Sequence, residues 1–309
     1  EGFGAYNQAV QKLLFGADSP LIAAGRVATF EALGGTGALR VGADFLRRLY
    51  PQAGVWISDP SWENHRALFE AAGFAVQAYP YYDAATHGLR FDAMLEALRG
   101  LPEHSIVVLH ACCHNPTGVD LNAAQWDAVV SMVRERGLVA FLDMAYQGFA
   151  EGIEPDAMAV RKFADSGLAF FVSSSFSKSF SLYGERVGAL SIVTADRDEA
   201  ARVTSQVKRV IRTNYSNPPT HGAAIVASVL ATPELRALWE QELAGMRDRI
   251  RAMRTGLVQR LRANGVDQDF SFVERQRGMF SYSGLNPKQV ERLREEFGIY
   301  AVGTGRICL

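Results

Sequence analysis

Cysteine is scarce in this chain, and its few cysteines form neither a disulfide pattern nor a metal-binding pattern. There are three in 309 residues, an adjacent pair at 112 and 113 and a third at 308. His110 and His114 flank the pair, but four potential ligands within five residues do not match the spacing of a zinc site. We therefore predict no bound metal. A chain without a disulfide framework suits a reducing compartment, so we expect a cytoplasmic location.

The sequence also lacks an excess of charge of either sign and lacks a long apolar run. Its formal net charge of −1 gives no reason to expect a nucleic-acid or membrane partner. No apolar run approaches the ~20 residues of a membrane-spanning helix. The length suffices for one large domain and a smaller one. Because the chain opens within a helical pattern and stops directly after an apolar segment, we expect that both ends of the natural protein are missing.

Lysine is scarce as well, and one of the five lysines stands apart. Four lie in charged, helical patterns, whereas Lys178 lies between two apolar runs in F-V-S-S-S-F-S-K-S-F-S-L-Y-G-E-R-V-G at 171–188. A half-desolvated lysine has a lowered pKa and a nucleophilic neutral amine. The serines and Arg186 suit a phosphate dianion. The combination suggests pyridoxal phosphate held as a Schiff base, and the alternative is a polar surface loop with an incidental lysine.

Strands and helices alternate over the first two thirds of the chain. Short runs rich in Val, Ile, Leu and Phe predict strands at 55–58, 75–79, 106–109, 139–142, 169–172 and 187–193, with amphipathic helices between them. Such apolar strands between helices indicate a mostly parallel sheet covered on both faces. Sites on these sheets form at the carboxyl ends of the strands.

Polar and aromatic residues gather at these strand ends. A glycine-rich turn at 34–40, G-G-T-G-A-L-R, opens a helix whose N-terminus suits an anion. Trp62, Asn115, Asp143 and Tyr146 each follow a predicted strand. Taken singly, these features also fit an ordinary turn, a core indole, a turn amide and a strand-end cap. Their convergence at one edge of the sheet predicts a single site.

After residue 194 the strand pattern gives way to helices. Apolar residues at spacings of three and four predict one long helix at 233–264 that bridges two domains. The remainder, 270–309, has the pattern of a small α+β lobe with one helix whose apolar residues, Phe297 among them, face inward. We therefore predict a large cofactor-binding domain at 1–232, with the long helix and a small C-terminal domain at 233–309.

Together these segments resemble the fold-type I, class I aminotransferases, the aspartate and aromatic amino acid aminotransferases. The resemblance covers residues 1–309 and rests on seven motifs in the family order. They are G-G-T-G-A-L-R, P-S-W-E-N-H, C-C-H-N-P-T-G, D-M-A-Y-Q-G-F, S-F-S-K-S-F-S-L-Y-G-E-R-V-G, N-Y-S-N-P-P and G-R-I-C-L. It implies an α/β fold with a mostly parallel sheet in a large domain, a smaller α+β domain, and pyridoxal 5'-phosphate as cofactor.

The resemblance also implies roles for single residues. Lys178 would bind the cofactor covalently and move the proton. Asp143 would pair with the pyridine nitrogen, supported from behind by His65 and His110, because a nearby carboxylate keeps that nitrogen protonated. The other implied cofactor contacts are Tyr146 and Asn115 at the ring hydroxyl oxygen, Trp62 stacked on the ring, and Gly35, Thr36, Ser175 and Arg186 around the phosphate.

Two arginines match the substrate-binding positions of the family. Arg306 would bind the substrate α-carboxylate as a bidentate pair, near Asn115 and Trp62. Arg212 would reach into the neighbouring subunit and bind the distal carboxylate of a dicarboxylic substrate, which implies a symmetric homodimer with shared sites. The family's N-terminal arm, with a substrate-covering glycine and a tyrosine that reaches the partner's phosphate, and its C-terminal helix would lie outside this sequence. We therefore expect residues 1–309 alone to be impaired in activity.

We interpret the chain as an aminotransferase that moves the α-amino group of tyrosine, phenylalanine and dicarboxylic amino acids to 2-oxoglutarate by a ping-pong mechanism. The wording of the lysine motif and of G-R-I-C-L favours the aromatic subgroup. The alternatives are a strict aspartate aminotransferase and a catalytically silent protein that retains the fold. A nicotinamide dehydrogenase is a further alternative, but G-G-T-G lacks the G-x-G-x-x-G spacing.

Overall fold

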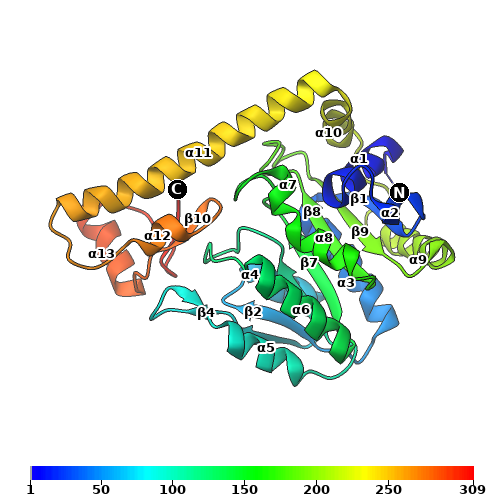
Figure 1. The fold of residues 1–309 in the computed structure, drawn as a ribbon, viewed down its shortest axis with the longest axis horizontal. Helices are drawn as coiled ribbons and strands as arrows, with labels where there is room; N and C mark the ends of the chain where they lie inside the picture. Colours follow the sequence, from blue (N-terminus) through cyan, green and yellow to red (C-terminus); the bar gives the residue numbers. More distant parts are fainter. Residues whose placement is uncertain (1) are drawn as a thin grey trace.

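A seven-stranded sheet forms the centre of the larger part of the molecule (Figure 1). In the computed structural model, which describes residues 2–309, the strand order is β1-β9-β8-β7-β6-β2-β3. Strand β9 runs antiparallel to both of its neighbours, and the other adjacent pairs are parallel. The expected mostly parallel α/β sheet is confirmed. The strands are β1 Val27–Leu33, β2 Val55–Asp59, β3 Val76–Pro80, β6 Ile106–His110, β7 Val139–Met144, β8 Phe170–Ser175 and β9 Val187–Val193.

One strand of the sheet does not follow from the sequence pattern. Strand β1 contains two polar residues, Thr29 and Glu31, which interrupt its apolar run. Both have partners in the fold: the Thr29 hydroxyl lies 2.9 Å from that of Ser191, and the Glu31 carboxylate accepts the backbone N–H of Phe3 at 2.8 Å. Because these partners come from distant segments, a local reading of the sequence does not reveal the strand.

Helices cover both faces of the sheet, and the alternation of side chains along each strand divides the interior into two cores. In β6, Ile106 and Val108 join the core under α3, α4 and α9, whereas Val107 and Leu109 join the core under α1, α5, α6 and α8. The helices of this part are α1 Gly4–Phe15, α2 Pro20–Ala23, α3 Gly34–Leu49, α4 Glu63–Ala71, α5 Phe91–Arg99, α6 Ala123–Arg136, α7 Ile153–Asp156, α8 Met158–Asp165, α9 Arg197–Asn214 and α10 His221–Ala231. A short hairpin joins β4 Tyr82–Asp83 to β5 Gly88–Leu89.

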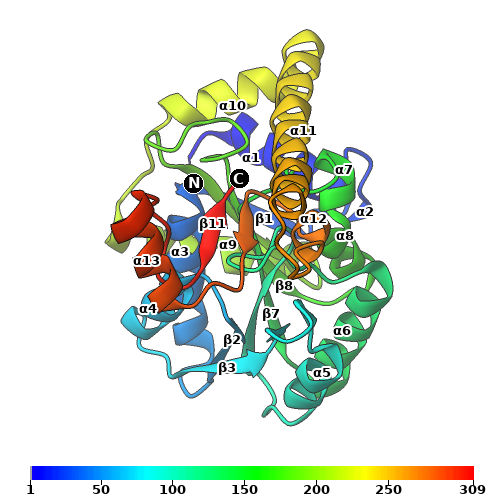
Figure 2. The same ribbon diagram turned by 90° about the vertical axis from the view of Figure 1, so that its left-hand side faces the viewer.

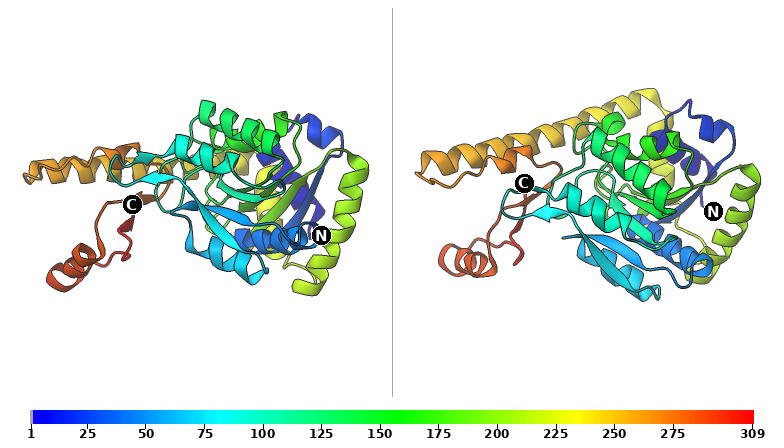
Figure 3. Two further views of the ribbon diagram at one scale, coloured as in Figure 1. Left: turned by 90° about the horizontal axis from the view of Figure 1, so that it is seen from below. Right: turned by 60° about the horizontal axis from the view of Figure 1, so that its bottom comes forward.

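A single helix, α11 (Pro233–Ala263), connects this part to a small C-terminal lobe (Figures 1 and 3). Near its start, Trp239 and Leu243 are buried in a core of the large part, and near its end Val258 belongs to the core of the small lobe. Helix α11 thus contributes to both, and the predicted division at residue 233 remains a proposal. The lobe contains α12 Phe272–Arg275, α13 Pro287–Phe297 and an antiparallel pair, β10 Phe280–Tyr282 with β11 Arg306–Cys308. Within residues 2–309, no helix is both long and apolar enough to cross a bilayer.

The inward orientation predicted for Phe297 is wrong. Its side chain is 65% exposed, whereas Val290 in the same helix is buried. Helix α13 stands away from the rest of the lobe, as both views in Figure 3 show. The apolar periodicity of a helix identifies its apolar face, but it does not guarantee that another element covers the whole of that face.

Backbone packs directly on backbone where α3 meets β9. A Cβ atom at Gly188 would clash with the carbonyl group of Gly34, the first residue of α3. Gly34 has a positive φ of 70°, which glycine adopts without strain, and its N–H donates to the Arg186 carbonyl at 3.0 Å. This close approach fixes the N-terminus of α3 beside the loop that contains Lys178.

We expect Gly188→Ala to destabilise the protein strongly, by several kcal/mol, because backbone atoms must move to admit the methyl group. Gly245→Ala is the matched control, since Gly245 lies in α11 with open space around it. Removing that helical glycine should raise stability by about 0.5–1 kcal/mol. Thermal and urea unfolding of both variants measure the effects. Equal stability of the two variants would show that the α3–β9 contact tolerates displacement.

Candidate active site

A cavity of about 410 Å³ lies between the carboxyl ends of the central strands and the small lobe. Figure 2 views the molecule from the side of β10 and β11, which close the cavity opposite the sheet. Of the site residues predicted from the sequence, all except Arg212 and the supporting His65 line it. They are Gly35, Thr36, Trp62, Asn115, Asp143, Tyr146, Ser175, Lys178, Arg186 and Arg306, together with His110.

Lys178 extends from the β8–β9 loop into this cavity. Its Nζ lies 4.8 Å from the centre of the Tyr146 ring and 5.9 Å from that of Tyr183. Partial burial lowers the pKa of the amine, and the nearby Arg186 lowers it further, while Asp143 acts in the opposite direction. The balance favours the neutral, nucleophilic form more than in a surface lysine.

Asp143, at the end of β7, carries a buried negative charge that is stabilised by two hydrogen bonds. Nε2 of His65 donates to its Oδ2 at 2.8 Å, and the Ser173 hydroxyl donates to its Oδ1 at 3.1 Å. The Ser61 hydroxyl lies 2.9 Å from Nδ1 of His65, which fixes the ring of the histidine. Burial by itself would raise the pKa of Asp143, but the His65 hydrogen bond and charge outweigh it, and the net pKa is lowered. The site thus presents a carboxylate.

The side chains of His110 and Asp143 form no hydrogen bond with each other. His110 pairs with Asp143 in the register of β6 and β7, and its ring packs on that of His65, with centroids 4.9 Å apart, so the support expected from His110 stays a prediction. Both of its ring nitrogens are buried without a partner within the described residues, at the wall of the cavity. Burial, reinforced by His65, lowers the pKa of His110 to about 3, so the ring is neutral.

A cradle for an anion forms where α3 begins. The first N–H groups of a helix have no partner within it and lie at its positive end, and here Gly35 and Thr36 face the cavity. A Cβ atom at Gly35 would lie 3.1 Å from Cβ of Ser175, so the glycine keeps the cradle open. Arg186 closes it: Nη1 donates to the Tyr183 carbonyl at 2.8 Å and lies 3.4 Å from the Ser177 hydroxyl.

A second guanidinium faces the cavity from the small lobe. Arg306, at the start of β11, donates through Nη1 to Oδ1 of Asn115 at 3.1 Å, and its guanidinium carbon lies 4.6 Å from the centre of the Phe280 ring. No carboxylate pairs with Arg306 within the part of the chain that the structure describes. The edge of the same phenylalanine meets Tyr146, whose pKa is raised by burial and by Asp143, so the phenol is neutral.

Two participants, Tyr183 and Phe280, escape the sequence reasoning. Ser173 and Ser177 belong to the serines around Lys178 that the sequence links to a phosphate, but Ser173 donates to Asp143. Tyr183 follows the lysine by five residues and lies under both cations of that loop. Phe280 has no local signal, because its role arises only when the small lobe is folded against the large one.

The group of residues around the cavity fits pyridoxal phosphate. The cradle at α3 suits the phosphate, Lys178 supplies the amine, and Asp143 supplies a charged carboxylate for the pyridine nitrogen. The indole of Trp62 lines the same cavity and offers a flat face to a ring.

Arg212 lies outside the cavity of its own chain. It is in the last turn of α9, exposed to solvent, and donates to the Ser216 hydroxyl at 2.9 Å. The structure therefore does not bring it together with the other predicted site residues.

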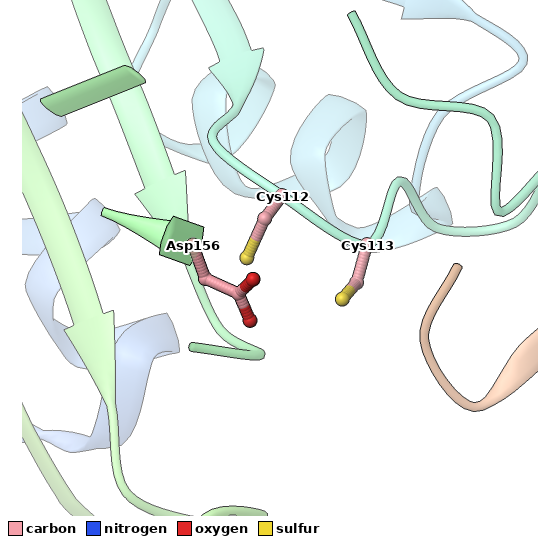
Figure 4. Close-up of side chains that lie close together, drawn as sticks. All are labelled: Cys112, Cys113 and Asp156. Atoms are coloured by element: carbon pink, nitrogen blue, oxygen red, sulfur yellow. The ribbon is translucent and has the colours of Figure 1, made fainter. Parts of the chain in front are cut away.

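Cys112, Cys113 and Asp156 form a compact cluster (Figure 4) and are not among the residues that line the cavity. Their sulfur and oxygen atoms lie within 4.8 Å of one another. The carboxylate of Asp156 already accepts four backbone N–H groups, from residues 148, 150, 151 and 152. The pKa of the Cys112 thiol is raised by its hydrogen bond to Cys113 and by burial, and burial raises that of Cys113 to about 11. A saturated carboxylate and protonated thiols make this cluster a structural one and a poor metal ligand set.

Comparison with known proteins identifies the same family that the sequence motifs resemble. The family model for aminotransferase class I and II matches residues 1–309. The chain is 72% identical over 309 residues to an aspartate aminotransferase of Pseudomonas aeruginosa and 54% identical to an aromatic-amino-acid aminotransferase of Escherichia coli. It covers 78% of each of these proteins, and each alignment includes 100% of this chain. A crystal structure of an aromatic-amino-acid aminotransferase from Burkholderia pseudomallei, covalently bound to pyridoxal phosphate, matches with a TM-score of 0.99 and 74% identity, covering 99% of this chain and 77% of that one.

The fold and the cavity define a transferase of fold type I with a site built for pyridoxal phosphate. The chain belongs to the class I and II aminotransferases. The family, the fold class and the cofactor expected from the sequence are confirmed, and a dehydrogenase is excluded.

We expect Lys178 alone to bind the cofactor covalently. The purified protein supplied with pyridoxal phosphate should be yellow, and borohydride reduction should attach the cofactor permanently to the peptide that contains Lys178. Mass spectrometry of the digested protein locates the label. Lys178→Ala serves as the control and should remain unlabelled, whereas a label on Lys12, Lys162, Lys208 or Lys288 would contradict the assignment.

Proposed function

We propose that the enzyme transfers the α-amino group of tyrosine, phenylalanine, aspartate and glutamate to 2-oxoglutarate. The observation that supports this best is the arrangement of Lys178 and Arg306 in one cavity. One offers an amine whose pKa is lowered by burial, and the other offers a guanidinium held by a neutral amide. An amino acid has on a single carbon atom an α-carboxylate, which pairs with a guanidinium, and an α-amino group, which can exchange with the lysine amine.

Each residue has a distinct task in this proposal. Bound pyridoxal phosphate supplies an electron sink for the carbanion that forms at the α-carbon. Lys178 takes the α-proton and returns it, which requires its amine to be neutral in the free state. Asp143 stabilises a positive charge on the pyridine nitrogen, and Tyr146 donates from its neutral phenol. Arg186 and the N-terminus of α3 hold the phosphate.

The breadth of the proposed specificity rests on the walls of the cavity. Leu39, Met279 and Phe280 provide an apolar surface suited to an aromatic side chain. The relatives are named for aspartate in one case and for aromatic amino acids in others, which is consistent with an enzyme that accepts both. A strict aspartate aminotransferase is the alternative. A silent protein is a poor account, because the amine, the carboxylate and both cavity arginines are in place.

A homodimer in the cytoplasm completes the proposal. Arg212 is exposed, lies outside the cavity of its own chain and donates to the Ser216 hydroxyl at 2.9 Å, so its guanidinium is available to a second subunit. The three cysteines are free thiols, consistent with a reducing compartment. In a symmetric dimer, each Arg212 would reach the site of the partner and bind the distal carboxylate of a dicarboxylic substrate.

The two arginines should differ in the substrates they affect. Removing one charged partner in a desolvated site costs about 3–5 kcal/mol, or hundreds- to thousands-fold in rate. Arg306→Ala should therefore lower kcat/KM for tyrosine and aspartate alike. Arg212→Ala should lower it by that order for aspartate and leave tyrosine within a few fold, because an aromatic ring has no charge to pair. Equal losses on both substrates in Arg212→Ala would make that arginine structural, and an unmutated enzyme inactive on tyrosine would establish the strict aspartate alternative.

Sharing of sites between subunits can be tested by mixing two variants that are each impaired with aspartate. Lys178→Ala removes the amine of a subunit's own site, and Arg212→Ala would remove the guanidinium from the partner's site. A mixed dimer then has one site with both lesions and one with neither, so part of the aspartate activity should return. Subunit exchange is checked with differently tagged chains. No recovery after proven exchange would show that Arg212 does not act across the interface.

A further inference from the structure

Arg254 is a buried cation without a counter-ion. It lies in α11 with a relative exposure of 2%, and no carboxylate pairs with it within residues 2–309. Its guanidinium donates to three backbone carbonyls, those of Val273 at 2.9 Å, Gly278 at 2.7 Å and Phe280 at 2.6 Å. Burial lowers the pKa of Arg254 to about 10, so it remains charged at neutral pH. An arginine in this position needs carbonyl partners to offset its desolvation, and here they all come from one segment.

That segment, residues 273–280, ends inside the active site. Phe280 lies beneath the guanidinium of Arg306 at 4.6 Å, and its edge meets the Tyr146 ring with centroids 5.9 Å apart. Nη2 of Arg254 donates to the carbonyl of this phenylalanine. The guanidinium of Arg254 therefore fixes the backbone that places the Phe280 ring under the guanidinium of Arg306.

Residues 273–280 pack tightly against the loop that contains Asn115. The N–H of Arg277 donates to the Gly118 carbonyl at 2.6 Å. A Cβ atom at Gly118 would lie 2.8 Å from the Phe280 carbonyl oxygen, and one at Gly278 would lie 2.6 Å from Cβ of Cys113. Both glycines have positive φ, so the two backbones meet where side chains would separate them. A shift of 273–280 would therefore displace both supports of Arg306, the ring of Phe280 and the amide of Asn115.

We propose that Arg254 is a positioning residue for substrate binding: its three hydrogen bonds fix Phe280 and, through this ring, orient the guanidinium of Arg306 toward the substrate α-carboxylate. The inference rests on the proposed role of Arg306. A guanidinium is required because its planar fork donates to several carbonyls at once, whereas the ammonium of a lysine is a compact point charge.

A neighbouring arginine of α11 supplies a matched control. Arg247 is also partly buried and also donates to a backbone carbonyl, that of Gly148 at 2.8 Å. That carbonyl belongs to the loop after β7 and lies outside residues 273–280. Replacing Arg247 removes a contact between α11 and the large part of the molecule but keeps the three hydrogen bonds of Arg254 to residues 273–280.

The test compares steady-state kinetics of Arg254→Lys and Arg247→Lys with aspartate and with tyrosine. In Arg254→Lys we expect KM to rise about tenfold for both substrates with kcat within about threefold, because the α-carboxylate contact is common to both. The absorption spectrum of the bound cofactor should stay unchanged. In Arg247→Lys we expect KM within about twofold of the unmutated enzyme. An unchanged KM in Arg254→Lys, or equal rises in the two variants, would overturn the proposal.

Phe280→Leu tests the route through the ring and keeps the proposal falsifiable if Arg254→Lys does not fold. By itself it should raise KM for both substrates, and combined with Arg254→Lys it should add little, because both changes release the same guanidinium. Unchanged KM in Phe280→Leu, or fully multiplicative effects in the double variant, would overturn the proposal.

Arg306→Lys distinguishes a failure of the proposed role of Arg306 from a failure of the positioning role of Arg254. If it leaves KM unchanged, the proposed role of Arg306 fails; if it raises KM while Arg254→Lys does not, only the positioning role of Arg254 fails.

Discussion

The charged carboxylate of Asp143, kept ionised although it is buried, is the constraint on which the site depends. Desolvation opposes this charge, so donors must surround it, and they come from separate elements. His65 lies on α4, whereas Ser173 pairs directly with Asp143 in the register of β7 and β8. Moving either strand by one residue would turn one partner to the opposite face. The parallel register and the position of α4 are therefore part of the chemistry of the site.

The remaining groups are placed by the way the chain returns to this edge of the sheet. Lys178 lies in the turn that reverses the chain from β8 into the antiparallel β9, and β9 supports the start of α3 through the glycine contact at 34 and 188. The Lys178 amine and the anion cradle at the start of α3 are thus both positioned by strand β9. The substrate side is different, since Arg306 and Phe280 belong to the small lobe. Their alignment depends on contacts between the lobes, such as that of Arg277 with Gly118, and on the hydrogen bonds of Arg254 within the small lobe.

The sequence predicts the features that have local signals and misses those that arise from contacts between distant segments. Lys178 stands out because it lies between apolar runs, and Asp143 because it ends one. Strand β1 is missed because its polar residues find partners far along the chain, and Phe297 is misplaced because apolar spacing does not say what covers a helix. Arg254 reads as an ordinary helix arginine; its partners are backbone carbonyls, which no side-chain pattern reveals. The roles of single residues follow from the family resemblance, because composition and periodicity do not indicate them.

The protonation state of the pyridine nitrogen in the bound cofactor tests the central claim most directly. The nitrogen-15 NMR shift of labelled pyridoxal phosphate on the protein reports it, followed from about pH 6 to about pH 9 and compared with Asp143→Asn. A buried, ionised Asp143 predicts a nitrogen that stays protonated across this range in the unmutated enzyme and loses its proton in the variant. A nitrogen that titrates in the unmutated enzyme, or one that is equally protonated in Asp143→Asn, would contradict the account.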